Sequence, residues 1–295
     1  GGGQLSGTGK LDVSGSTWGL GGDFVKDNGT LTSSGTLTLS ETDLALSGNS
    51  KLTSDVALSF VNLNLNDSKL TLGSPTDNLT VQNAITIDAS TEGILTGEAD
   101  LILMSALTMS EGLLQSSGGT WEFNGDFKKT SGTLSITETD LTLTSSITLT
   151  SDDVLSFATL NLNTFTLTLG NSTSDLTIEE AITIDSSGEG ISTGEADLKL
   201  SAFQNISIGS VTSTGGTISL LSGGQLSGTG ELDVSGSTWV LGGDFVKDNG
   251  TLTSSGTLTM SQTNLALSGN STLTSDEVLS FVTLSLNDFK LTLGS

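Results

Sequence analysis

The sequence predicts an all-β fold, a parallel β-solenoid with three short strands in each turn of about 21 residues. Three observations support this prediction. Apolar triplets return at intervals of roughly one turn, apolar and polar residues alternate inside each triplet, and a long segment of the chain occurs twice almost unchanged.

The triplets fall into three series whose members lie roughly 20 to 22 residues apart, with looser spacing in the third. The first series passes through Leu37, Leu58, Leu79, Leu101 and Trp121. The second passes through Leu44, Leu63, Ile85 and Leu107, and the third through Leu52, Leu70, Ile94 and Leu113. Three short strands in each period predict a solenoid turn with three sides.

Within a triplet the usual order is Leu-Thr-Leu, Leu-Asn-Leu or Ile-Thr-Ile, so the apolar side chains point inward and the polar one outward. Pairs such as Asn28-Gly29, Gly48-Asn49 and Asn249-Gly250 stand between triplets and favour turns. Pro75 is the single proline, as expected where most backbone N–H groups must pair.

Residues 2–74 return as residues 223–295, and a more divergent copy lies between them. We therefore expect one continuous solenoid segment over residues 1–295, an excerpt of a longer array, with internal repeats at approximately 2–118, 119–222 and 223–295. A stacked turn needs neighbours on both sides to bury its apolar residues, so further turns or further copies are expected along the axis.

The composition removes many kinds of chemistry. The chain has no His, Cys or Tyr, its nine basic residues are all Lys, and its formal net charge is −24. General acid–base and nucleophilic catalysis lack their usual residues, so we expect no enzyme and no cofactor. The negative charge disfavours nucleic acid as a partner. No apolar run reaches the roughly 18 to 20 residues that cross a bilayer, so we expect no membrane insertion in this segment.

Segments such as Gly-Thr-Leu-Thr-Leu, Leu-Ala-Leu-Ser-Gly-Asn-Ser and Gly-Gly-Gln-Leu-Ser-Gly-Thr-Gly resemble the repeats of large bacterial β-helical surface adhesins. Autotransporter passengers and filamentous-haemagglutinin-like exoproteins are the nearest comparison. The resemblance covers the whole chain in texture and lacks a diagnostic signature. It implies a right-handed parallel β-helix, exported to the cell surface, that acts as a stalk, a fibre or an adhesive surface.

Paired acids are the candidate metal ligands, namely Asp152 with Asp153 and Asp276 with Glu277. Such pairs could bind Ca²⁺ loosely, or supply the carboxylates of a polysaccharide-degrading β-helix. Adjacent strand residues point to opposite faces, and the first copy has Asp55-Val56 where the second has Asp152-Asp153. A solvated acidic corner is therefore the favoured interpretation.

A Trp-containing motif occurs three times and has two interpretations. Its residues are Trp18, Trp121 and Trp239, followed by Asp23, Asp126 and Asp244. If they were exposed in a row, the indole rings would stack on glycans and the carboxylates would accept hydrogen bonds from sugar hydroxyl groups. Each Trp also shares its strand face with an apolar residue, as Trp121 does with Phe123, which favours packing inside the column.

We expect a non-catalytic structural repeat module of an extracellular or cell-surface fibre or adhesin. Its partners would be further copies or flanking repeats, and surface glycans. The first alternative is a carbohydrate-binding module that uses the Trp and Asp residues. Ice binding is a weaker alternative, because units such as Thr142-Leu143-Thr144 and Thr166-Leu167-Thr168 do not recur at the spacing of one turn.

Overall fold

The computed structural model describes side chains at residues 42–53, 57–202, 204–226, 228–234, 236–246, 264–267, 279 and 281–293. It also describes the strand backbone at residues 3–5, 10–12, 17–20, 24–26, 36–38, 54, 247, 257–259, 271–275 and 294. The chain divides into two compact units, Gly1–Thr142 and Leu143–Ser295. The candidate residues Asp23, Asp276 and Glu277 lie outside the described residues.

In the first unit the strands form parallel stacks. One stack contains β1 (Gly3–Leu5), β4 (Phe24–Lys26), β7 (Ser50–Ser54), β10 (Lys69–Leu72), β13 (Gly93–Gly97), β16 (Leu113–Ser116) and β19 (Thr133–Ile136). A second contains β8 (Leu58–Phe60), β11 (Leu79–Val81), β14 (Leu101–Leu103) and β17 (Thr120–Phe123). A third contains β12 (Ile85–Ile87), β15 (Leu107–Met109) and β18 (Phe127–Lys129).

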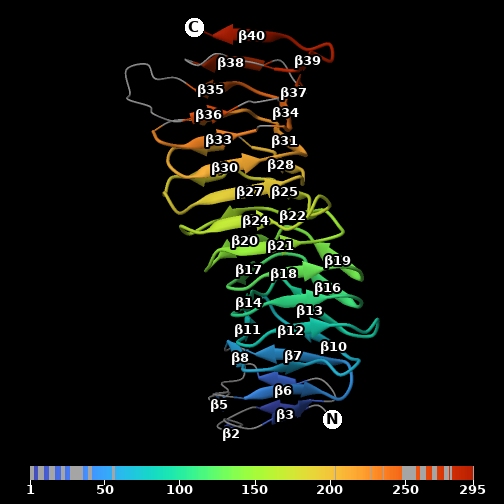
Figure 1. The fold of residues 1–295 in the computed structure, drawn as a ribbon. Coiled ribbons are helices and arrows are strands. Elements are labelled where there is room, and N and C mark those ends of the chain that lie inside the picture. The colour runs from blue at the N-terminus through green and yellow to red at the C-terminus, as the bar shows by residue number, and fades with distance from the viewer. Residues whose placement is uncertain are drawn as a thin grey trace. The chain divides into compact units, whose positions relative to one another are not determined.

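Figure 1 shows β10, β13 and β16 of the first stack as successive arrows. Two smaller groups of strands complete this unit. The groups are β3 (Thr17–Leu20) with β6 (Asp43–Leu46) and β9 (Leu63–Asn64), and β2 (Lys10–Asp12) with β5 (Thr36–Thr38). Strand β20 (Asp140–Leu143) spans the boundary between the units.

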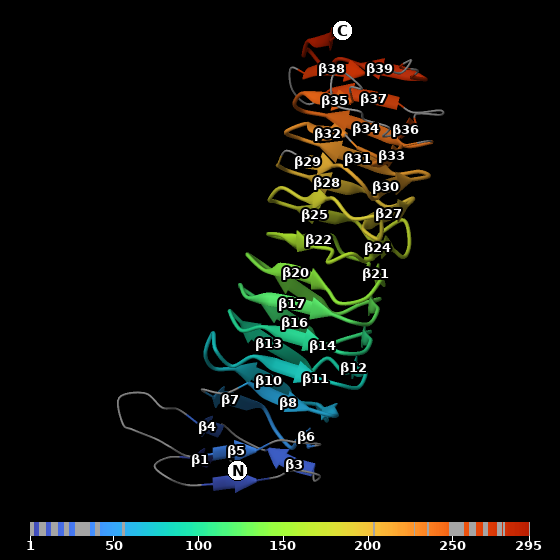
Figure 2. The ribbon, with the colours of Figure 1, turned by 90° about the vertical axis from the view of Figure 1, so that its left-hand side faces the viewer.

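The second unit has the same construction, and Figure 2 shows β25, β28, β31 and β34 following one another in one stack. That stack contains β22 (Leu155–Phe157), β25 (Leu176–Ile178), β28 (Leu198–Leu200), β31 (Thr217–Leu220), β34 (Thr238–Leu241), β37 (Asn264–Leu267) and β39 (Thr283–Ser285).

Its other two stacks are equally regular. One has β21 (Ile147–Thr150), β24 (Thr166–Leu169), β27 (Gly190–Gly194), β30 (Ser210–Ser213), β33 (Glu231–Asp233) and β36 (Thr257–Thr259). The other has β26 (Thr183–Ile184), β29 (Gln204–Ile206), β32 (Gly224–Leu226), β35 (Phe245–Lys247), β38 (Ser271–Ser275) and β40 (Leu291–Gly294). Strand β23 (Leu160–Asn161) also belongs to this unit.

The regular elements of the described residues are all strands, and their pairs are parallel, so each unit is a parallel β-solenoid with three strands in a turn. The predicted fold class is confirmed. Leu79 lies opposite Leu58 of the preceding turn and opposite Leu101 of the following turn. Turns differ in length, and a longer one separates Leu70 from its partner Ile94. The predicted right-handedness and the continuity of the solenoid over residues 1–295 remain predictions.

The core is a set of apolar columns along each stack. Leu58, Leu79, Leu101 and Trp121 face one another in successive turns and are all fully buried. The central residue of each triplet points outward, so the strand pattern alternates between buried and partly exposed. The apolar residues of each triplet therefore point into the solenoid and the polar residue between them points outward, as a side-chain period of two predicts.

One predicted inward residue is wrong by a single position. Ile94 lies opposite Leu114, which is fully buried, whereas Leu113 is half-buried and points to the outer face. Two adjacent leucines allow either register, and a shift of one residue exchanges the two faces of a strand.

Polar side chains join successive turns at the corners. The Asp100 carboxylate accepts a hydrogen bond from the Thr120 N–H, 2.8 Å away. In the second unit the Asp197 carboxylate accepts one from Thr217 N–H at 2.6 Å, and the Asp175 carboxylate accepts one from Asp197 N–H at 2.9 Å. These bonds satisfy backbone donors that the ladders leave free, so many corner acids are structural.

Glu92 holds the corner that precedes β13. The residue is 7% exposed, and its carboxylate accepts hydrogen bonds from the backbone N–H groups of Asp88 at 3.0 Å, Ala89 at 3.4 Å and Asp67 at 3.3 Å. Asp67, in the preceding turn, has a positive φ of 61°. The side chain therefore ties a strained corner of one turn to the next turn.

We expect Glu92→Ala to lower the free energy of unfolding by about 2–3 kcal/mol, because it leaves three part-buried backbone N–H donors without their charged acceptor. The matched control is Glu189→Ala, which removes the same contacts to Thr164, Asp185 and Ser186 at a more exposed position. Its cost should be about 1 kcal/mol. Urea unfolding followed by circular dichroism gives both values, and a larger loss for the half-buried Glu189 would contradict this ranking.

Candidate functional site

The described Trp residues lie inside the solenoid. Trp121 and Trp239 are fully buried. Trp121 packs on Phe123 with ring centroids 5.9 Å apart, and Trp239 meets Phe245 edge to face at 5.0 Å. The interpretation of these two residues as core is confirmed, and the alternative of an exposed stacking platform is wrong for them. The side chain of Trp18 lies outside the described residues.

The acids that follow the Trp residues lie on the other side of the wall. Asp126 and Asp244 are exposed, and their backbone carbonyls accept hydrogen bonds from Leu107 N–H at 3.0 Å and Gly224 N–H at 2.9 Å. A buried ring and an exposed carboxylate cannot contact the same sugar. The predicted glycan contact through Trp121 with Asp126, or through Trp239 with Asp244, is therefore not supported by their positions.

Asp152 and Asp153 form an exposed corner between β21 and β22. The N–H of Asp153 donates to the Ser151 hydroxyl oxygen at 3.0 Å. Over the described part of the chain, the acids do not gather into a group of three or more that could hold a metal ion. Loose Ca²⁺ binding at this corner stays a prediction. The described residues also include no helix long and apolar enough to cross a membrane.

Outward hydroxyls form one column on the second unit. Thr148 lies opposite Thr168, Thr168 opposite Ser192, and Ser192 opposite Thr212. The Thr-x-Thr units themselves do not align, since Thr166 and Thr168 lie opposite Gly190 and Ser192 of the next turn. Threonine is common on the outer face of a sheet for its β-propensity alone, so this column does not by itself indicate a ligand.

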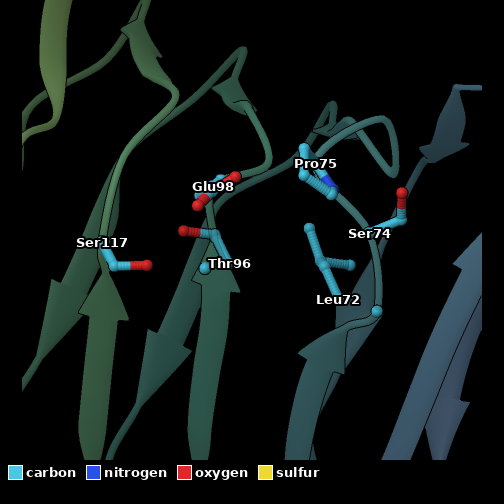
Figure 3. A pocket seen from close by; sticks show the side chains of 8 residues that line it. Leu72, Ser74, Pro75, Thr96, Glu98 and Ser117 are labelled. Carbon is cyan, nitrogen blue, oxygen red and sulfur yellow. The ribbon is translucent and has the colours of Figure 1, made fainter.

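A pocket of about 320 Å³ opens at a corner of the first unit. It is lined by Leu72, Gly73, Ser74, Pro75, Thr96, Gly97, Glu98 and Ser117. These residues come from three successive turns, at the ends of β10, β13 and β16. Figure 3 shows Leu72 and Pro75 on one side, Thr96 and Glu98 next to them, and Ser117 beyond, with the hydroxyls of Thr96 and Ser117 pointing toward each other.

The length of one corner creates this pocket. Thr71 lies opposite Leu95 and Leu95 opposite Gln115, while Leu79, Leu101 and Trp121 align in the next stack. The corner from Thr71 to Leu79 is therefore longer than either of the corners that follow it. The extra residues, around Ser74 and Pro75, stand out from the wall, and the shorter corners form the adjoining floor.

The sequence interpretation missed this site. Its residues are spread along the chain from Leu72 to Ser117, and no motif joins them. The available signal was the single Pro, which stands between the triplets that begin at Leu70 and Leu79. Proline in such a corner fills space and contributes no N–H donor.

The described residues define a parallel β-solenoid with an apolar, aromatic-containing core, acid-rich corners and a small corner pocket. Comparison with protein-family models, with curated proteins and with solved structures gives no match to this chain.

Proposed function

We propose that the chain is a non-catalytic structural repeat module of an extracellular or cell-surface fibre or adhesin. One observation carries this proposal: within each unit, parallel strands in register join successive turns, and residues 2–74 of the sequence return as residues 223–295. The stability of a stacked fold of this kind increases with each added turn, so such a fold favours long, rod-like molecules.

The distribution of polar groups supports the same function. The carboxylates of several corner acids, including Glu92, Asp100 and Asp197, accept hydrogen bonds from backbone N–H groups of this chain. The remaining acids and the net charge of −24 keep neighbouring rods apart in solution. The partners are further copies or flanking repeats along the axis, with surface glycans as the adhesive target and with no role for nucleic acid.

Electron microscopy of the protein in its native state tests the proposal. We expect filaments whose axial repeat is about 4.8 Å, the spacing of stacked strands. Antibodies raised against the chain should label intact cells as strongly as permeabilised ones. Discrete globular particles would refute the fibre, and labelling that requires permeabilisation would refute the surface location.

A further inference from the structure

The corner pocket has one apolar and one polar side. Leu72 and the ring of Pro75 provide carbon atoms on one side, Glu98 provides oxygen atoms next to them, and the hydroxyls of Thr96 and Ser117 lie farther along the corner (Figure 3). A volume of about 320 Å³ is at the small end of ligand sites, enough for one six-membered ring with its substituents. The pocket therefore fits a small molecule that is itself apolar on one face and polar on its edge.

Two of the polar side chains are available to a ligand. The nearby acids Asp77 and Glu92 accept backbone N–H groups, from Gly73 at 2.7 Å and from Asp88 at 3.0 Å. By contrast, the Glu98 carboxylate and the Ser117 hydroxyl make no side-chain hydrogen bond within the described residues, and both residues are exposed. Glu98 is thus an acid that the described part of the fold does not use.

The third hydroxyl, that of Thr96, donates to the Gln115 carbonyl at 3.3 Å and is buried. Its remaining capacity is that of an acceptor. Together with the Glu98 carboxylate, it presents acceptors to the pocket, while the Ser117 hydroxyl can both donate and accept. This set matches vicinal hydroxyl groups, which donate to a carboxylate and accept from a serine.

The local charge favours a neutral ligand. The Lys51 side chain reaches this corner from the preceding turn, with its Cε 2.7 Å from the point where a Cβ on Gly73 would stand. The carboxylates of Glu98 and Asp77 and the ammonium group of Lys51 therefore border the same corner. An anionic ligand would meet Glu98 directly and the field of an acidic chain beyond it.

We propose that this pocket binds a single neutral pyranose ring, as a free sugar or as one residue of a neutral glycan. The C–H face of the ring packs on Leu72 and Pro75, and its hydroxyls bond to Glu98 and Ser117. The site is open and has no aromatic ring, so its affinity is in the millimolar range and a fibre with many copies would bind by multivalency. A monomeric chain would show the same binding, so failure of this proposal and failure of the fibre are separate results.

The second unit contains a matched corner of equal length. Asn171 and Ser172 stand there where Ser74 and Pro75 stand in the first unit, and Glu195 stands for Glu98. Asn171 is already engaged, because its Oδ1 accepts hydrogen bonds from Thr173 N–H at 3.1 Å and from the Ser174 hydroxyl at 2.6 Å. This corner therefore has a glutamate but no proline. Thr148 stands in place of Lys51, so the second-unit corner lacks the positive charge and would bind a cation better than the first-unit corner if charge alone decided.

The test is a backbone-amide NMR titration of the whole chain with methyl α-glucoside, methyl α-galactoside and methyl α-mannoside. Glucuronate and glucosamine serve as the anionic and cationic probes. We expect at least one neutral glycoside to give saturable shifts at Gly73, Gly97 and Ser117, with no such shifts from glucuronate. The amides of Gly170, Gly194 and Thr214 should stay unchanged.

Two variants complete the test. Glu98→Gln should weaken binding about tenfold, because it removes a charged acceptor, whereas Glu195→Gln should have no effect. The double exchange Ser74→Asn with Pro75→Ser introduces two residues of the second unit's corner and leaves Asp77, which stands where the second unit has Ser174. It removes the proline wall, so it should abolish the shifts.

Four results would overturn the proposal. They are no saturable shift with any of the three glycosides, a response to glucosamine alone, equal shifts at both corners, or unchanged binding in the double exchange.

Discussion

Trp239→Ala is expected to lower the free energy of unfolding of the second unit by about 3–5 kcal/mol, the usual loss when a buried Trp is truncated. The ring is fully buried and lies between Ile218 and Leu265 in its column. Its edge-to-face contact with Phe245 would be lost as well. Hydrogen exchange of the amides in β31, β34 and β37 measures the loss where it occurs.

Trp239→Phe is the matched control, with an expected loss of about 1–2 kcal/mol. It keeps an aromatic ring in the column and removes the indole N–H, which is buried and has no acceptor among the described residues. Deleting a donor that forms no bond removes no stabilising contact. If the alanine variant kept the exchange rates of the parent chain, the buried position of Trp239 would be wrong and an outer, ligand-facing ring would return as an explanation.

Gly119→Ala is expected to lower the free energy of unfolding by about 2–5 kcal/mol, as the sum of two costs. Gly119 has a φ of +69°, which disfavours any residue with a Cβ. A Cβ there would also stand 2.6 Å from the Glu98 carbonyl oxygen and 2.8 Å from that of Ala99, both in the preceding turn. Urea unfolding of the variant measures the sum.

Gly97→Ala separates the two costs. Gly97 has a similar φ of +61°, but a Cβ on it would have no atom within 4 Å. Only the conformational cost of about 1–2 kcal/mol should therefore remain. Gly216 and Gly194 repeat this comparison in the second unit, since the first meets the Ala196 carbonyl oxygen at 2.5 Å and the second meets nothing within 4 Å. Equal losses at Gly119 and Gly97 would show that the turns are not as closely stacked as the structure has them.

Local patterns in the sequence were sufficient for the fold class. Alternation in triplets such as Leu79-Thr80-Val81 is a property of adjacent residues, and it predicted both the strands and their inner faces. The recurrence of these triplets predicted which ones stack, because in a solenoid the neighbour in space is the neighbour in the series. The burial of Trp121 followed from its sharing a face with Phe123.

Other features depend on contacts that the local sequence does not specify. Leu63, Leu65 and Leu72 are at most 6% exposed, whereas the equivalent Leu284, Leu286 and Leu293 of the second copy are 44% exposed or more. Strand β10 pairs with both β7 and β13, while β40 pairs with β38 alone among the described strands. The same side chains are buried or exposed according to whether another turn lies on them.

The candidate site lies wholly in this second category. Its walls come from Leu72 and Pro75 of one turn, Thr96 and Glu98 of the next and Ser117 of the turn after that. The sequence by itself determined the period, the inward residues of most strands and the position of the core. The tertiary structure alone decided what the longer corner covers, because a small difference in the length of one loop changes which residues of the neighbouring turns it contacts.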